Sequence, residues 1–179
     1  MNGVTKSYGM IGEFTTAAAV LHAAQKVRDA GFRKWDVVTP FPVHGMDKAM
    51  GLKDSHLGWN VLPLGLTGTL SAFAMMYWMN GIDYPLNVGG KPFFGWPQFV
   101  PITWELLVLT AALTGLIGFL ALCGLPMPYH PVFNVPQFAR ASQDRFFLVI
   151  EAVDPQYHPD RTREFLATLT PVSIAEVPE

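Results

Sequence analysis

Cysteine is almost absent from this sequence, since Cys123 is the single one among 179 residues. One thiol excludes a disulfide within the chain, and it excludes an iron–sulfur cluster or a C-x-x-C-H haem attachment held by this chain alone. The five histidines have no H-x-x-x-H or H-x-E spacing, and none lies in a long apolar run. We therefore expect no metal or haem bound by this chain itself.

Charge is also scarce, and it is unevenly distributed. Only 15% of the residues are charged, whereas half are hydrophobic. Between residues 55 and 139 the only charged side chains are Asp83, Lys91 and Glu105. The formal net charge of −2 argues against nucleic-acid binding, which needs a basic stripe. Charged ends around an apolar middle are typical of a membrane protein with soluble flanks.

Two apolar runs, residues 59–79 and 101–123, are long enough to cross a bilayer. As a helix, the first run would extend about 31 Å, close to the hydrocarbon thickness. Residues 80–100 between them are rich in glycine, proline and aromatic side chains, which predicts a loop at the membrane interface. The alternative, a buried hairpin in a soluble protein, requires a larger domain than this chain can supply.

The distribution of lysine and arginine predicts the orientation of this hairpin. Residues 1–58 carry seven of the 12 basic side chains, residues 124–179 carry four, and the loop has only Lys91. The positive-inside rule then places both termini in the cytoplasm and the loop in the periplasm. The glycine pairs 65/68 and 115/118 would let two helices approach closely. They predict packing within the hairpin or against another subunit's helix.

The two flanks have the patterns of alternating strands and helices. Before the membrane we expect a strand at 8–14, a helix at 15–31 and a strand at 35–38. After it we expect a strand at 145–153, a helix at 158–169 and a strand at 172–177. This order is that of a ferredoxin-like split βαβ sandwich, with the hairpin in place of the turn between the second and third strands. Neither flank has a sufficient core alone, so we predict one small α+β domain built from residues 1–58 and 124–179.

Three side chains are candidates for a proton path: Glu105, Asp83 and His130. Glu105 is expected in the first turn of the second span, where it is either an interfacial carboxylate favoured by the helix dipole or part of a proton or quinol-side pathway. His130 is either a proton exchanger at the cytoplasmic face or a loop histidine bonded to the backbone. No catalytic, cofactor-binding or metal-binding residue is predicted.

Several long phrases beside the two spans are distinctive: "YGMIGEF", "FRKWDVVTPFPVHGMDKAMGL", "GWPQFVPITWEL", and "LPMPYHPVFN" followed by "FARASQDRFFLVIEAVDP". Together they resemble the D subunit of bacterial alternative complex III, a quinol-oxidising electron-transfer complex of the inner membrane. The resemblance implies a cofactor-free subunit with two transmembrane helices and a cytoplasmic α/β domain, packed against large quinol-related membrane subunits. Haem c, iron–sulfur clusters and the quinol site would then belong to partner subunits, and electrons would pass to cytochrome c or a copper protein.

We therefore predict an accessory, structural subunit of a respiratory or photosynthetic electron-transfer complex, with no catalytic centre of its own. The alternative is a free-standing membrane assembly factor or a small-molecule sensor with a ferredoxin-like cytoplasmic domain. A sensor would need convergent polar groups, whereas the segments "FFLVIEAV" and "VLHAAQKV" offer mainly core residues. This composition favours the structural role.

Overall fold

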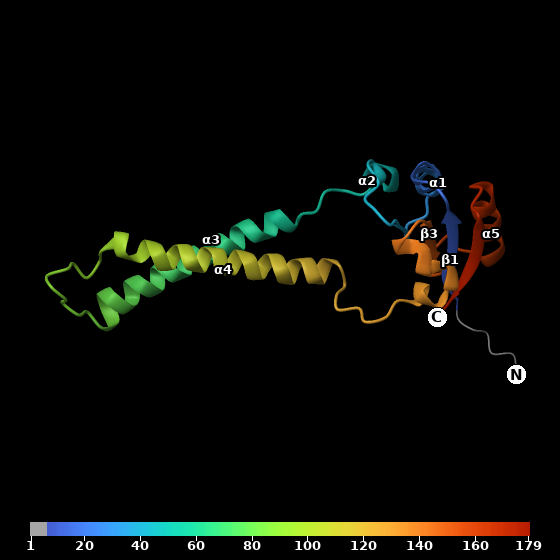
Figure 1. Ribbon diagram of the computed structural model, residues 1–179. Coiled ribbons are helices and arrows are strands. Elements are labelled where there is room, and N and C mark those ends of the chain that lie inside the picture. Colours follow the sequence, from blue (N-terminus) through green and yellow to red (C-terminus); the bar gives the residue numbers. More distant parts are fainter. Residues whose placement is uncertain (1–6) are drawn as a thin grey trace, which may run out of the picture. The chain divides into compact units, whose positions relative to one another are not determined.

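The chain forms two compact units in the computed structural model, which describes residues 7–179. Unit 1 combines Met1–Lys53 with Pro128–Glu179, and unit 2 is Asp54–Met127. Unit 2 is thus an insertion in the sequence of unit 1. Figure 1 traces the elements of each unit along the chain.

Unit 1 contains a four-stranded sheet with the order β2-β3-β1-β4. The strands are β1 (Ser7–Phe14), β2 (Trp35–Val38), β3 (Phe146–Glu151) and β4 (Ser173–Pro178). All three pairings are antiparallel. Strand β1 lies between β3 and β4, so a strand from the amino-terminal flank is hydrogen-bonded on both edges to strands from the carboxy-terminal flank.

Helices α1 (Ala17–Asp29) and α5 (Pro159–Thr168) pack on one face of this sheet. Thr16 caps α1, because its side chain accepts a hydrogen bond from Ala19 N at 3.2 Å. The buried residues of α1 are Val20, Ala23, Ala24 and Val27. The helix ends at Asp29, two residues before the predicted end at residue 31.

The opposite face of the sheet is covered by two short 3-10 helices, η2 (Pro131–Asn134) and η3 (Pro136–Ser142). Their apolar side chains, with the strand residues they contact, form a second core cluster: Val132, Val135, Phe138, Ala141, Ile11, Phe147, Val149 and Val177. The sequence analysis assigned no element to this segment. Because both faces are covered, β1 and β3 are buried on both sides, which explains the continuous apolar run of β3.

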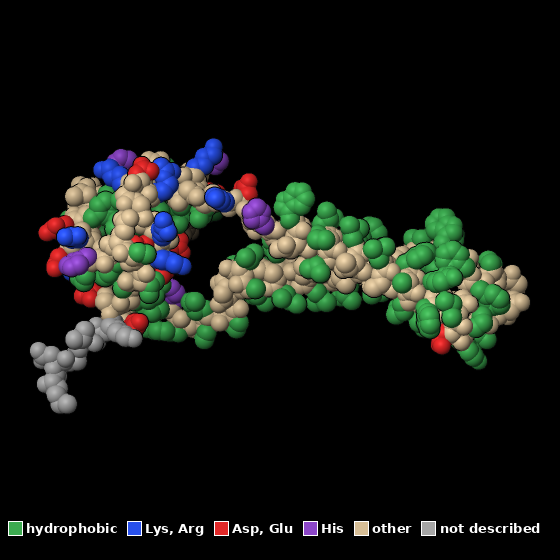
Figure 2. Space-filling view, turned by 180° about the vertical axis from the view of Figure 1, so that it is seen from behind, with side chains coloured by type: hydrophobic (Ala, Val, Ile, Leu, Met, Phe, Trp, Pro, Cys, Tyr) green, Lys and Arg blue, Asp and Glu red, His purple; other side chains and the backbone are tan. Residues whose placement is uncertain are grey.

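Unit 2 is a helical hairpin. Helix α3 (Leu57–Trp78) continues into the π-helical turn η1 (Met79–Asp83), and α4 (Trp96–Leu122) packs against α3. Leu57–Asp83 and Trp96–Leu122 are both long and apolar enough to cross a membrane. Figure 2 shows hydrophobic side chains along the whole length of this unit, whereas most charged side chains gather on unit 1.

The predicted loop at 80–100 was too long at both ends. Residues 79–83 extend α3 as η1, and α4 begins at Trp96 instead of near residue 101. Pro97 is tolerated because it occupies the first turn of α4, where backbone N–H groups have no partner within the helix. Pro101 lies inside α4 and removes one further N–H donor without ending it.

Candidate functional site

The three candidate residues for a proton path lie in different units. Asp83 and Glu105 belong to the hairpin, and both are exposed. His130 belongs to unit 1, where it is half-buried just before η2. Asp83 is the last residue of η1.

Glu105 lies deeper in its helix than the sequence analysis predicted. Because α4 begins at Trp96, Glu105 is nine residues further on, about 13.5 Å along the axis. The prediction of a first-turn carboxylate was wrong, since the helix continues backwards through Pro97. A favourable interaction with the positive end of the helix dipole, which falls off within the first turn, no longer explains this residue.

The interface between α3 and α4 depends on glycines that face the other helix, as one of the two predicted arrangements required. A Cβ atom added at Gly68 would lie 2.2 Å from Thr110 Oγ1, and one at Gly65 would lie 3.5 Å from Ala111 Cβ. From the opposite side, a Cβ at Gly118 would lie 2.6 Å from Leu57 Cδ1. These glycines therefore accommodate larger side chains of the partner helix and do not meet one another.

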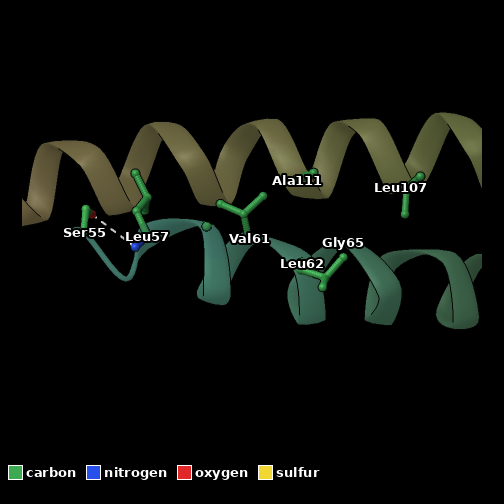
Figure 3. Close-up of a pocket in the computed structure, with 8 residues that line it drawn as sticks. Ser55, Leu57, Val61, Leu62, Gly65, Leu107 and Ala111 are labelled. Atoms are coloured by element: carbon green, nitrogen blue, oxygen red, sulfur yellow. Dashed lines mark hydrogen bonds between the residues drawn. The ribbon is translucent and has the colours of Figure 1, made fainter.

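An apolar groove of about 580 Å³ runs along one side of this interface. Figure 3 shows Leu57, Val61 and Leu62 of α3 opposite Leu107 and Ala111 of α4. At one end, Leu57 N donates a hydrogen bond to Ser55 Oγ at 3.2 Å. No lining residue of the groove is titratable, so the groove offers a packing surface and no acid–base chemistry.

Titratable side chains gather instead in a pocket of about 250 Å³ within unit 1, here called the Tyr8 pocket. It lies between the sheet and the η2–η3 segment, and its lining residues are Tyr8, Asp36, Val38, His130, Val132, Phe133, Phe138, Val149 and Glu151. Asp36 pairs across the strands with Val149, so Glu151, two residues along β3, is its diagonal neighbour on the same face. The register of the sheet thus brings two carboxylates to one pocket.

His130 is held in this pocket by two hydrogen bonds. Its Nδ1 accepts from Val132 N at 3.4 Å, which is the backbone contact that the simpler interpretation predicted. Its Nε2 lies 3.1 Å from the Tyr8 hydroxyl, and the two rings contact edge to face. In a neutral ring whose Nδ1 accepts, Nε2 carries the proton and donates to Tyr8.

The electrostatic field of the Tyr8 pocket is negative. Burial, with the nearby Glu151 and Asp36 carboxylates, raises the pKa of Tyr8 to about 12. Each of these three effects disfavours a phenolate, so the hydroxyl keeps its proton at neutral pH. The Tyr8 hydroxyl therefore remains a hydrogen-bond donor there.

The two buried carboxylates among the described residues of unit 1, Asp154 and Glu13, have structural partners. Asp154 accepts hydrogen bonds from the backbone N–H groups of Arg33, Lys34 and Gln156 at 2.6–2.8 Å. Burial alone would raise the pKa of Asp154, but these donors and the Arg33 charge together lower it. Asp154 thus joins the segment before β2 to the loop after β3.

Glu13 is the second of these carboxylates. Ser173 Oγ donates a hydrogen bond to Glu13 Oε2 at 2.8 Å. Arg145 Nε lies 3.3 Å from Glu13 Oε1, an ion-pair contact without hydrogen-bond geometry. Both contacts join β1 of the amino-terminal flank to residues of the carboxy-terminal flank, so Glu13 helps to hold the two flanks together.

The Tyr8 pocket was missed in the sequence analysis, apart from His130. Asp36 in "WDVV" and Glu151 in "FFLVIE" are single acidic residues in otherwise apolar strands. This pattern is the only feature of the sequence that could have indicated the pocket. Their convergence depends on strand register, which neither pattern contains. Within residues 7–179, no group of three or more His, Cys, Asp or Glu side chains is arranged to hold a metal ion.

Comparison with known families gives a match over nearly the whole chain. The family model described as "Alternative complex III, ActD subunit" matches residues 8–176. No curated protein is similar enough to count as a match. The matched range includes both flanks and the hairpin, so it covers unit 1 and unit 2 alike.

Proposed function

Because this chain belongs to the family of ActD subunits of alternative complex III, we propose that it serves that complex as a cofactor-free accessory subunit of the bacterial inner membrane. The observation that carries the proposal is the hairpin, whose exposed surface is apolar along two helices and whose two grooves have no acid–base group in their linings. Such a surface is suited to packing against lipid and against the helices of large membrane subunits. It is a poor site for chemistry.

The accessory role implies a division of labour within the complex. Haem c, iron–sulfur clusters and bound quinol belong to partner subunits, and electrons pass from them to cytochrome c or a copper protein. The single cysteine and the spacing of the histidines in this chain support that division. The rival function, a free-standing assembly factor or sensor, has no specific observation in its favour now that the family is known.

The proposed topology places both termini in the cytoplasm and residues 84–95 in the periplasm. The basic residues of the flanks and the single Lys91 of the loop support this orientation. In cells with Cys123→Ser, a membrane-impermeant thiol reagent is expected to label Asn87→Cys from outside but not Glu164→Cys. Labelling of Glu164→Cys in intact cells would refute the topology.

For unit 1, we propose a ferredoxin-like fold with the hairpin in place of the turn between β2 and β3. The strand order β2-β3-β1-β4, the antiparallel pairings and the packing of α1 and α5 on one face support this assignment. The η2–η3 layer on the other face is an addition to that sandwich.

We also propose that Glu105, Asp83 and His130 contribute to a proton path that neighbouring subunits complete. The support is the exposure of Glu105 in an apolar helix about two and a half turns from its start, where an ionised group is expensive unless it has a partner or water. In the assembled complex, Glu105→Gln is expected to slow proton release coupled to quinol oxidation. Unchanged proton release in Glu105→Gln, Asp83→Asn and His130→Gln complexes would refute the path.

The accessory role has its own test. The complex is purified from cells that lack this chain, and quinol oxidation is compared with that of the complete complex. We expect lower yield and lower thermal stability, with the haem content per complex unchanged. Haem or iron that stays with this chain after the subunits are separated would contradict a cofactor-free subunit.

A further inference from the structure

We propose that the Tyr8 pocket binds a lysine or arginine side chain of a neighbouring subunit and thereby attaches unit 1 to the rest of the complex. The proposal rests on membership of the complex and is independent of the accessory role. Its basis is a negative, aromatic-walled pocket whose carboxylates have no basic partner among residues 7–179.

The charged residues of the pocket favour a basic occupant. Asp36 and Glu151 line the pocket, and no lysine or arginine lines it. The ion pairs of the described residues use Glu13, Asp29 and Asp144 as acids. Asp36 is exposed and Glu151 is half-buried, and they are diagonal neighbours on one face of the sheet. Their like charges repel each other, and an incoming cation relieves that repulsion.

The aromatic side chains that line the pocket also favour a cation. Phe133 is 70% exposed although it contacts Phe138 edge to face, with ring centroids 5.4 Å apart. On the other side, Tyr8 and His130 form a second edge-to-face pair. An exposed ring beside carboxylates offers a cation–π contact to an ammonium or guanidinium group, and this contact would also cover the ring.

The volume of the pocket suits a single side chain. The pocket volume of about 250 Å³ is below the ~300–1,000 Å³ typical of sites for drug-sized ligands. It is large enough for the end of one long side chain. The hydroxyl of Tyr8 and the ring of His130 also line the pocket and add polar contacts.

A cross-linking experiment identifies the occupant. Phe133 is replaced by the photoreactive amino acid benzoylphenylalanine in the complete complex, and this change leaves both carboxylates in place. Irradiation is expected to give a covalent product with another subunit, in a peptide that contains a lysine or arginine. A product within this chain alone, or no protein product at all, would overturn the proposal.

A salt-release experiment measures the charge contribution. The double variant Asp36→Asn, Glu151→Gln keeps the side-chain shapes, and its retention in the complex is expected to fall about tenfold or more in moderate salt, because close ion pairs at interfaces contribute at least that factor. The matched control is Glu164→Gln, an exposed carboxylate on α5, which packs on the other face of the sheet. Equal retention of the double variant and the control would refute the ion pair.

One alternative occupant lies in this chain, because Lys6 precedes β1 and lies outside the described residues. Lys6→Met should leave both the cross-link and the retention unchanged. If Lys6→Met reproduces the release of the double variant, the pocket binds its own chain and the proposal fails. These outcomes do not depend on quinol oxidation, so they are separate from the test of the accessory role.

Discussion

Substitution of Gly68 by alanine tests the packing of the hairpin directly. The added Cβ would lie 2.2 Å from Thr110 Oγ1, 2.7 Å from its Cγ2 and 2.9 Å from its Cβ. All three are far below van der Waals contact, and Thr110 cannot easily turn away. Its hydroxyl donates to Leu106 O at 2.6 Å and also lies within hydrogen-bond distance of Leu107 O. The helices must therefore separate, or Thr110 must give up its hydrogen bonds.

The cost of this change follows from those contacts. Overpacking of a tight interface costs about 1–3 kcal/mol, and loss of the Thr110 hydrogen bond adds about 1 kcal/mol. We expect Gly68→Ala to destabilise the hairpin by about 2–4 kcal/mol. Gly115→Ala is the matched control, because its Cβ would meet only Val61 Cγ2, at 3.9 Å. It should be neutral or stabilising by up to about 1 kcal/mol, since alanine is the better helix former.

Intrinsic fluorescence during titration of detergent micelles with sodium dodecyl sulfate provides the assay. Four of the five tryptophans lie in unit 2, so the signal reports mainly on the hairpin. The double variant Gly68→Ala, Thr110→Ala removes the two nearest atoms and should be less destabilised than the sum of the single changes. If Gly68→Ala and Gly115→Ala unfold at the same denaturant fraction, the contact at Gly68 is not the one that holds the helices together.

Three further predictions concern unit 1. Asp154→Ala should cost about 3 kcal/mol, because charge-assisted bonds to three backbone N–H groups are lost. Because the pKa of Asp154 is lowered in the folded state, its contribution to the free energy of unfolding is complete above the unfolded-state pKa of about 3.9. That contribution is lost as the pH falls through the folded-state pKa. Asp154→Asn should therefore weaken the fall of the thermal-unfolding midpoint with decreasing pH in the acid range. Gly9→Ala should disrupt the pairing of β1 with β3, since its Cβ would lie 2.1 Å from Ile150 O, and amide exchange of both strands should rise; unchanged exchange would contradict this. Thr16→Ala should lower the unfolding free energy by about 1 kcal/mol in a chemical denaturation, and a value near zero would mean that water replaces the cap.

The elements with strong periodicity or clear stop signals were predictable from sequence. Helix α1 shows why, because Thr16 supplies the N-cap and Gly31 adopts the positive φ of 89° that ends a helix favourably. All four strands were found within one or two residues of their observed ends. In each case the determinant is local, so one segment of sequence contains it.

The elements that were missed depend on contacts between distant segments. The 3-10 helices η2 and η3 are short and rich in proline, and only the second face of the sheet gives their apolar side chains a place to pack. The register between α3 and α4 could not be predicted from the sequence either. The spacing of the glycines shows which helix face packs, but it does not show which side chain of the partner helix lies opposite each glycine. The same limit hid the Tyr8 pocket, whose acidic residues come from β2 and β3.

The strand order also has a consequence for how the two flanks become one unit. Strand β1 pairs with β3 and β4, and β2 pairs with β3, so the paired residues of the amino-terminal strands all face strands that are synthesised after the hairpin. Until residues 146–178 emerge, β1 presents two unpaired edges and its buried side chains lack their core. The hairpin is therefore synthesised before the sheet can be completed.

Separate expression of the two pieces tests this order. A chain that ends at residue 127 should insert in the membrane but show protease-sensitive residues 7–53, because β1 and β2 have no partner strands. Co-expression of residues 128–179 should restore protection, since that piece supplies β3, β4 and α5. Protection of residues 7–53 in the truncated chain alone would show that the amino-terminal flank folds without the sheet, and the pairing scheme would then not control assembly of unit 1.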